Sequence, residues 1–279
     1  MKVLIVGAAG MLGQAVRRAF QENELLCWDR NECDIADPKS TGLVVAAQPE
    51  LIINTAAMTA VDACEADEAA ANAVNGHGVE HLARAACALD IPIIHFSTDY
   101  VFDGTNEAGY AENAAPGPLN AYGRSKLLGE QLLERHATKW FLIRTSYLYG
   151  LAGRNIVETF INLGKTKSEL TILVDQFSKT TYANDLAVAT EALLSRGAPW
   201  GIYHLVNEGT ITWMDFVSTL YALVGLESKL KPVTMKEYIR PAHRPQYSAL
   251  VNTKQPPLRH WEEALTAYLA ERNQPATLE

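Results

Sequence analysis

The sequence predicts an α/β protein built on a doubly wound parallel sheet, with a smaller C-terminal region interleaved with it. Short apolar runs alternate with amphipathic stretches through the first half of the 279-residue chain. Those runs are continuously apolar, as strands covered on both faces require. The intervals between them are long enough to hold the crossover helix that connects two parallel strands. Repetition of this unit with right-handed crossovers gives a doubly wound sheet.

Five apolar runs in the first half are expected to be the strands. They are Lys2–Val6, Leu25–Trp28, Leu51–Asn54, Ile91–Ser97 and Trp140–Arg144. The segment Met11–Gln21 has helical spacing of its apolar residues. The intervals Ala66–Leu89 and Ala121–His136 are rich in Ala, Leu, Glu and Arg, which favour helix.

The pattern loosens after Gly150. We expect strands at Leu170–Val174 and Gly201–Val206, and helices at Ala183–Leu194 and Trp213–Val224. The stretch 231–257 holds five of the twelve prolines and little periodicity, so we expect it to be mostly loop. No linker or repeat separates the two halves, which predicts that the second half interleaves with the first.

The charge and the cysteines exclude several classes of protein. With 24 basic and 32 acidic residues the formal net charge is −8, which argues against nucleic acid and anionic membranes as partners. No apolar stretch approaches the roughly 18–20 residues that span a bilayer. The four cysteines form no CxxC pair, so we expect neither a zinc site nor a disulfide framework. A cytoplasmic protein is the expectation.

A glycine-rich turn joins the first strand to the first helix. It reads Gly7-Ala8-Ala9-Gly10-Met11-Leu12-Gly13, a variant of the dinucleotide-binding fingerprint. Gly7 permits the tight turn, Gly10 lets the backbone approach a pyrophosphate, and Gly13 lets helix and sheet pack closely. The alternative is a tight turn without a ligand. Its place after an N-terminal strand and at a helix start favours a cofactor.

The end of the second strand carries two residues that bear on the choice of cofactor. Asp29 suits the free ribose hydroxyl of NAD, and Arg30 suits the 2′-phosphate of NADP. The sequence has both, so the choice stays open, as does the alternative of solvated turn charges. Asp34 and Ile35 follow, where an acidic residue can bind the adenine amino group in a fold of this kind.

A YxxxK pair lies on a predicted helix. The spacing of Tyr122 and Lys126 puts both side chains on one helix face. A lysine ammonium close to the phenol lowers the phenol pKa toward neutrality, and the lysine can hold the nicotinamide ribose. Ser97 or Thr98, at the end of the fourth strand, can polarise a substrate carbonyl. Asn75 either holds a water near Lys126 or is a solvated surface residue.

These features together resemble the extended short-chain dehydrogenase/reductases, and within them the dTDP-4-dehydrorhamnose reductases. The most specific segment is Ser97–Gly104, which reads STDYVFDG. Further matching segments run nearly from end to end of the chain. They are Ile53–Asp62, Ala121–Lys126, Arg144–Ser146, Asp175–Phe177, Gly201–Leu205, and Arg244–Pro245 with Ser248.

The resemblance implies a reductase of a dTDP-linked 4-keto-6-deoxy sugar that uses NADPH, with NADH also possible, and forms dTDP-L-rhamnose. It implies that Thr98, Tyr122 and Lys126 are the catalytic triad. It implies further cofactor contacts at Ala56, Ala57 and Thr59. It implies substrate contacts at Thr59, Val61, Thr98, Asp99, Tyr100, Tyr122, Tyr147 and Arg244, the last near the diphosphate. Relatives can form homodimers with magnesium at the contact, but no ligand cluster in this sequence places the ion.

Two departures from the pattern of these reductases leave the sugar nucleotide open. Residues 177–181 read Phe-Ser-Lys-Thr-Thr where a glycine and a Pro-Thr pair are usual, and residues 247–252 also deviate. A reductase of another nucleotide-linked 4-keto sugar is therefore an alternative. Tyr100 stands where the related dehydratases carry their catalytic glutamate, which disfavours dehydration.

A protein of another class also fits much of the motif set. A non-catalytic regulatory subunit resembling the β-subunit of methionine adenosyltransferase shares this ancestry. A regulator has no chemical need for a complete Thr98, Tyr122 and Lys126 set, so the set favours catalysis.

The motifs also divide the chain. We expect residues 1–145 to form an NAD(P)-binding domain of Rossmann type, with segments around 180–206 returning to it. Residues 146–279 then form mainly the substrate-binding region. Because a protein of net charge −8 must bind two anionic ligands, we expect a locally positive cleft made by the first helix N-terminus, Arg30, Lys126 and Arg244.

Overall fold

A computed structural model describes residues 1–153 and 155–273, and its centre is a six-stranded parallel sheet. In the spatial order β10-β5-β4-β3-β1-β2, every neighbouring pair is parallel. The strands are β1 (Lys2–Val6), β2 (Glu24–Trp28), β3 (Leu51–Asn54), β4 (Ile93–Thr98), β5 (Trp140–Thr145) and β10 (Gly201–His204). The chain leaves β1 in one direction to β2 and returns on its other side to β3, which makes β1 the switch point of the sheet. The doubly wound prediction is confirmed.

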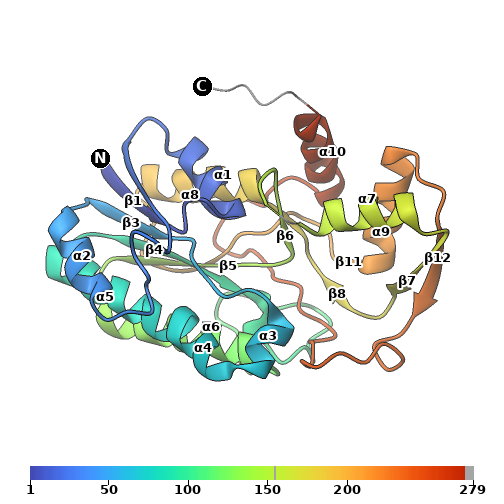
Figure 1. The fold of residues 1–279 in the computed structure, drawn as a ribbon, viewed down its shortest axis with the longest axis horizontal. Helices are drawn as coiled ribbons and strands as arrows, with labels where there is room; N and C mark the ends of the chain where they lie inside the picture. The colour runs from blue at the N-terminus through green and yellow to red at the C-terminus, as the bar shows by residue number, and fades with distance from the viewer. Residues whose placement is uncertain (154, 274–279) are drawn as a thin grey trace.

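Helices cover both faces of this sheet (Figure 1). On one face lie α1 (Met11–Ala19) and α8 (Ala183–Ser195), and on the other lie α2 (Ser40–Ala47), α5 (Gly78–Leu89) and α6 (Ala121–His136). One apolar core lies between the sheet and the first pair of helices, and a second lies on the opposite face. Burial on both sides explains why the strand sequences are apolar without alternation.

The interval 66–89 is not one helix, contrary to the sequence-based expectation. It is divided among α3 (Val61–Ala66), α4 (Glu68–Asn72), a π-helical turn η1 (Ala73–His77) and α5. Asn75 in η1 is buried: its amide accepts from Met58 N at 2.8 Å and donates to Met58 O at 2.9 Å and to Ser125 Oγ at 3.0 Å. These bonds fix the wider turn, so Asn75 is not a solvated surface residue. Single π-helical turns are frequent at functional sites.

The rest of the second half forms a smaller layer beside the carboxyl ends of the strands (Figure 1). It contains β6 (Leu148–Tyr149), α7 (Ile156–Thr166), β7 (Glu169–Leu173), β8 (Phe177–Ser178), β9 (Thr181–Tyr182), β11 (Ile211–Thr212), α9 (Trp213–Val224), β12 (Lys229–Val233) and α10 (Trp261–Arg272). Its own core is strongly aromatic and includes Tyr149, Phe216, Trp261 and Tyr268. The strand predicted to reach residue 206 ends at His204, and the stretch 231–257 is mostly loop after β12 ends.

A buried ion pair fixes α6 on the sheet. Glu130 of α6 accepts from Arg144 of β5 through Nε at 3.0 Å and Nη2 at 2.7 Å. It also accepts from Ser97 Oγ of β4 at 2.5 Å. Both charged side chains are 3% exposed. Tyr122, Lys126 and Glu130 follow one another at intervals of four residues, so this ion pair sets the position of the whole helix face that they share.

We predict that Glu130→Gln lowers the free energy of unfolding by about 3–5 kcal/mol, because it leaves the buried Arg144 guanidinium without a compensating charge. Urea unfolding of purified protein measures this loss. Glu68→Gln is the matched control, since Glu68 pairs with Arg124 at 2.8 Å on the surface and both side chains are more than 40% exposed. That change should cost under about 1 kcal/mol. Equal losses in the two variants would contradict the assignment.

Candidate active site

The glycine turn has the geometry of an anion site. Gly7 has φ +79°, and a Cβ there would lie 2.7 Å from the backbone nitrogen of Ala56. Gly13 packs so closely on Gly7 and Ala8 that any side chain would meet their backbone. Gly10 is the N-cap residue of α1, so no side chain caps this helix end, and no acidic residue lies in the first turn. The free amides and the positive end of the helix dipole therefore suit a diphosphate.

The structure separates the roles of Asp29 and Arg30, the two residues at the end of β2. Asp29 Oδ1 accepts from the backbone nitrogen of Ala9 at 2.9 Å, so its carboxylate supports the glycine turn. The Arg30 side chain is 86% exposed, and its Nε lies 3.1 Å from Asp34 Oδ2. Ile35, next to Asp34, is buried. Arg30 can therefore reach an external anion by giving up one exposed ion pair.

The segment after β3 lies against the same turn. Thr55 Oγ1 donates to Val6 O at 2.8 Å and to Gly7 O at 3.0 Å. Ala56 and Ala57 follow as half-buried residues, and Thr59 is exposed. The half-buried Val61 begins α3. These four sequence-predicted residues thus lie at the switch point, where a doubly wound sheet binds its ligand.

Thr98 and Tyr122 come together at the carboxyl end of β4. The N-terminus of α6 approaches β4 closely because Gly123 packs directly on the backbone carbonyl of Tyr100, where no Cβ would fit. Thr98 Oγ1 accepts from the backbone nitrogen of Tyr100 at 3.2 Å, and the Tyr100 ring packs edge-on to the Tyr122 ring at a centroid distance of 5.9 Å. A hydroxyl and a phenol are thereby brought to one point.

The side chain of Lys126 is turned toward the sheet. Its Nζ donates to Phe96 O at 2.7 Å and lies 3.3 Å from His95 Nε2. Burial lowers the pKa of Lys126 to about 8, and burial raises the pKa of Tyr122. The structure therefore does not show the expected lowering of the Tyr122 pKa by Lys126, because burial of the phenol has the larger effect and the Lys126 side chain is bound to β4.

Asp99 is a buried carboxyl group that joins three segments. It accepts from Thr98 Oγ1 at 3.1 Å, from Ser178 Oγ of β8 at 3.1 Å and from Ser248 Oγ at 2.5 Å. Asp99 is 2% exposed. Burial raises its pKa to about 6, against the opposing effect of these hydrogen bonds. Asp99 therefore connects Thr98 to the C-terminal layer.

Tyr147, expected on the sugar side, has a backbone conformation unusual for a residue with a side chain. Its φ is +37°. Its hydroxyl accepts from Gln176 Nε2 at 2.6 Å and lies 3.5 Å from the hydroxyl of Tyr100. Its ring lies 4.5 Å from that of Trp213. Residues held in sparsely populated conformations are found most often at functional sites.

Arg244 and Arg240 differ in the charge of their hydrogen-bond partners. Arg244 is 8% exposed and binds Asp62 through both terminal nitrogens at 2.6 and 2.9 Å, which holds the pKa of Asp62 at about 2. Arg240 is half-buried, and its Nη2 donates to the neutral Gln176 Oε1 at 3.2 Å. Sequence reasoning missed Arg240, because no motif includes it.

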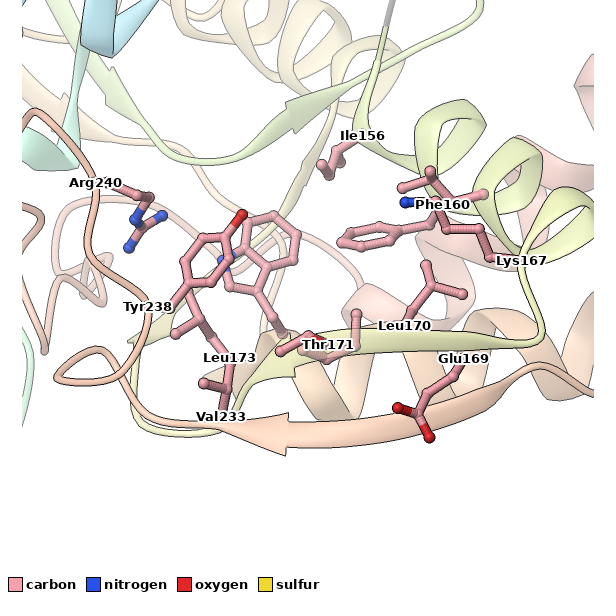
Figure 2. Close-up of a pocket in the computed structure, with 13 residues that line it drawn as sticks. Ile156, Phe160, Lys167, Glu169, Leu170, Thr171, Leu173, Val233, Tyr238 and Arg240 are labelled. Atoms are coloured by element: carbon pink, nitrogen blue, oxygen red, sulfur yellow. The ribbon is translucent and has the colours of Figure 1, made fainter.

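A pocket of about 520 Å³ adjoins Arg240. Figure 2 shows Arg240 at one end and Lys167 at the other, with the rings of Phe160 and Tyr238 between them. Trp213 also lines it, and the same indole packs on Tyr147. Sequence reasoning missed this pocket as well, since its walls come from segments that lie far apart along the chain.

The two departures from the pattern of the resembling reductases meet in space. The ring of Phe177 stacks on the ring of Tyr247 at 5.1 Å with an interplanar angle of 11°. The two backbones also form an isolated parallel bridge, in which Phe177 N donates to Gln246 O at 2.7 Å. The two segments that depart from the pattern therefore pack on each other, beside the two serines, Ser178 and Ser248, that bind Asp99.

Residues 1–153 and 155–273 contain no group of three or more His, Cys, Asp and Glu side chains that could hold a metal ion. Within the same ranges, no helix has the length and apolar character needed to cross a bilayer.

Comparisons with known proteins agree with this geometry. The family model described as RmlD substrate binding domain matches residues 1–274. The spore coat polysaccharide biosynthesis protein SpsK of Bacillus subtilis is 38% identical over 98% of both chains. A dTDP-4-dehydrorhamnose reductase of Burkholderia thailandensis is 36% identical over 90% of this chain and 91% of its own. The structure of the Bacillus anthracis dTDP-4-dehydrorhamnose reductase with NADP superposes with a TM-score of 0.93 at 33% identity, covering 97% of this chain and 99% of that one.

We predict that Asp99 makes the protein less stable as pH rises. The folded state holds this carboxyl at a pKa of about 6 and the unfolded chain at about 3.8, so the folded state binds more protons between these values. The contribution of Asp99 to the free energy of unfolding should therefore fall by about 2 kcal/mol from pH 4 to pH 7. Urea unfolding at both pH values, compared with Asp99→Asn, measures the difference.

Asp62→Asn is the matched control for this measurement. Because Arg244 holds the pKa of Asp62 at about 2, that carboxylate stays ionised across the same range, and its loss should leave the slope between pH 4 and pH 7 unchanged. If the free energy of unfolding changed equally from pH 4 to pH 7 in wild type and in Asp99→Asn, the raised pKa of Asp99 would be refuted.

Proposed function

Because the chain belongs to the RmlD substrate binding domain family, we propose that it reduces the C4 keto group of dTDP-4-dehydro-L-rhamnose to give dTDP-L-rhamnose. It is an NAD(P)H-dependent oxidoreductase of the extended short-chain dehydrogenase/reductase type. The observation that carries the proposal is that Thr98 and Tyr122 both pack on Tyr100 at the carboxyl end of β4, in the sheet whose first strand ends in the glycine turn. A relative named for spore coat polysaccharide biosynthesis supports a role in supplying nucleotide sugars for cell-surface polysaccharide.

We propose NADPH as the preferred cofactor. Arg30 is exposed and can bind a 2′-phosphate by giving up its exposed ion pair with Asp34, whereas the Asp29 carboxylate is bound to the glycine turn. A structural neighbour that holds NADP supports this preference. The diphosphate would lie at the N-terminus of α1, with Gly7, Gly10, Met11, Leu12 and Gly13 around it. Asp34 and Ile35 would lie near the adenine, and Ala56, Ala57 and Thr59 would line the cofactor.

The chemistry needs few groups from the chain. Bound NADPH supplies the hydride that attacks C4. Thr98 donates a hydrogen bond to the keto oxygen and so stabilises the negative charge that develops there. Tyr122 gives its phenolic proton to the resulting alkoxide, which completes the alcohol. Lys126 in its ammonium form stabilises the phenolate that remains and binds the nicotinamide ribose.

The substrate would lie between the two halves of the chain. We propose that residues 1–145, with the segments around 180–206, bind the cofactor, and that 146–279 cover the sugar nucleotide. Val61, Tyr100 and Tyr147 would face the sugar. Arg244, with Arg240 beside it, would form the cationic end of the cleft near the diphosphate. The aromatic pocket lined by Trp213 and Tyr238 would then accept the nucleoside.

One observation favours a second candidate, a reductase of another nucleotide-linked 4-keto sugar. Phe177 and Tyr247 replace two elements of the usual pattern and stack on each other beside Ser178 and Ser248, which bind Asp99. A changed pair at this place can reshape the sugar site while leaving Thr98 and Tyr122 in position.

We further propose that the protein works in a reducing compartment such as the cytoplasm, because all four cysteines are free. A homodimer is also a proposal, drawn from the family. The described residues offer no ligand cluster from which a magnesium ion between two copies could be argued.

We predict that Tyr122→Phe slows NADPH oxidation with dTDP-4-dehydro-L-rhamnose by about 100-fold or more, because the alkoxide loses its proton donor. The decay of NADPH absorbance measures the rate. Tyr203→Phe is the matched control: its hydroxyl donates to Pro199 O at the far edge of the sheet, so the rate should stay near wild type. Equal rates for wild type and Tyr122→Phe would refute Tyr122 as the donor. No decay in wild type, with decay for a different nucleotide-linked 4-keto sugar, would favour the second candidate.

We predict that Arg30→Ala raises the KM for NADPH about tenfold or more and leaves the KM for NADH unchanged, because only the 2′-phosphate forms a charge-assisted bond with Arg30. Steady-state rates with each cofactor measure both constants. Arg17→Ala, which removes an exposed arginine from the last turn of α1, controls for the loss of one positive charge. An equal effect on both cofactors would place Arg30 outside the 2′-phosphate site.

A further inference from the structure

The proposed chemistry does not explain why Lys126 is bound to β4. The residue is 2% exposed, and its Nζ has two polar contacts, with Phe96 O and His95 Nε2. In the part of the chain that the structure describes, no carboxylate forms an ion pair with Lys126. Glu130, one turn further along α6, is already paired with Arg144. A buried ammonium in such a place would lack a compensating charge.

The donor and acceptor roles of the side chains next to Lys126 can be assigned by starting from the backbone amide of Ala56. Ala56 N–H is necessarily a donor, and it lies 3.1 Å from Asn54 Oδ1. The oxygen of the Asn54 side chain therefore faces Ala56, which turns Nδ2 toward His95 Nδ1 at 3.1 Å. Because an amide NH₂ group only donates, His95 Nδ1 must carry a lone pair. The ring proton of a neutral His95 then lies on Nε2.

His95 is held neutral by its surroundings. It is fully buried, and burial lowers its pKa well below the usual range. Its Nε2–H points at Lys126 Nζ. An ammonium has three donors and no acceptor, so only the amine form of Lys126 can accept this hydrogen. The amine also has an N–H to donate to Phe96 O, so its two neighbours are both satisfied by the uncharged form.

We propose that Asn54 and His95 are positioning residues that set the charge of Lys126. The chain of hydrogen bonds from Ala56 through Asn54 and His95 ends as a donor at Lys126 and favours its uncharged amine. This inference rests on the proposed function to the extent that Lys126 serves the reduction.

Other groups packed around Lys126 also influence its charge, in addition to the hydrogen bond from His95. From α6, Glu130 raises the pKa of Lys126, and Tyr122 lies one turn away. From β5, Arg144 neutralises Glu130. From η1, Asn75 is uncharged. Burial has the largest effect, and the pKa of Lys126 is lowered to about 8. Since the ammonium is the form that stabilises the phenolate of Tyr122, reduction should decline above the pH at which Lys126 loses its proton.

The tautomer of His95 is the direct test. Long-range proton–nitrogen NMR of the full chain with ¹⁵N-labelled histidine distinguishes the two neutral tautomers. His95→Gln identifies the signals of His95 among the seven histidines. The expected result is the tautomer protonated at Nε2, near neutral pH and without cofactor. A ring protonated at Nδ1, or a charged ring, would overturn the proposal.

Asn54→Asp tests the link to activity. A carboxylate still accepts from Ala56 N–H, but it also accepts from His95 Nδ1–H, so Nε2 becomes an acceptor for the Lys126 ammonium. The tautomer should reverse, and the basic limb of the pH profile of kcat/KM should move upward by about one pH unit. Asn155→Asp is the matched control, because Asn155 is a buried asparagine that caps α7 away from this chain. Its basic limb should not move.

The outcomes separate this inference from the proposed function. A reversed tautomer in Asn54→Asp with an unmoved basic limb would overturn the control of Lys126 by His95. If Asn54→Asp does not fold, the wild-type tautomer still decides. A wild type that is protonated at Nε2 but reduces no nucleotide-linked 4-keto sugar would contradict the proposed function and leave the hydrogen-bond chain standing.

Discussion

The ion pair between Glu130 and Arg144 is the constraint on which the site depends. Two charges removed from water are costly unless each finds its partner, so α6 can pack on β4 and β5 in one register only. Tyr122 and Lys126 lie on the same helix face as Glu130. That single register therefore brings the phenol to Thr98 and the amine to the interior of the sheet.

The same logic of local compensation answers the problem posed by the net charge of −8. Arg244 is paired with the Asp62 carboxylate, whereas Arg240 donates to the neutral side chain of Gln176 and lies over the ring of Tyr238. Arg30 shares its charge with Asp34 in an exposed pair that water already weakens. The cleft is thus positive where an arginine lacks a strong internal partner. Charges elsewhere on the surface have little influence on the potential in the cleft, because salt screens charges that lie farther apart than about a Debye length.

Much of the candidate site was predictable because its motifs each lie within a few consecutive residues of the sequence. The turn from Gly7 to Gly13 and the pair Tyr122–Lys126 are each read within one or two helical turns, and the fold sets them side by side through its parallel strands. Arg240, the aromatic pocket and the π-helical turn at Asn75 were not predictable. Each depends on contacts between segments remote in sequence, such as Asn75 with Met58 and Ser125.

The sequence by itself indicated the six strands of the central sheet, the helices α1, α6, α8 and α9, and the helix face shared by Tyr122 and Lys126, because these follow from local sterics and from the period of apolar residues. Only the tertiary structure decided that Lys126 points to β4 and that His95 presents a proton to it. That choice is set by hydrogen-bond partners on β3, β4 and α6, which folding alone brings within reach of one another.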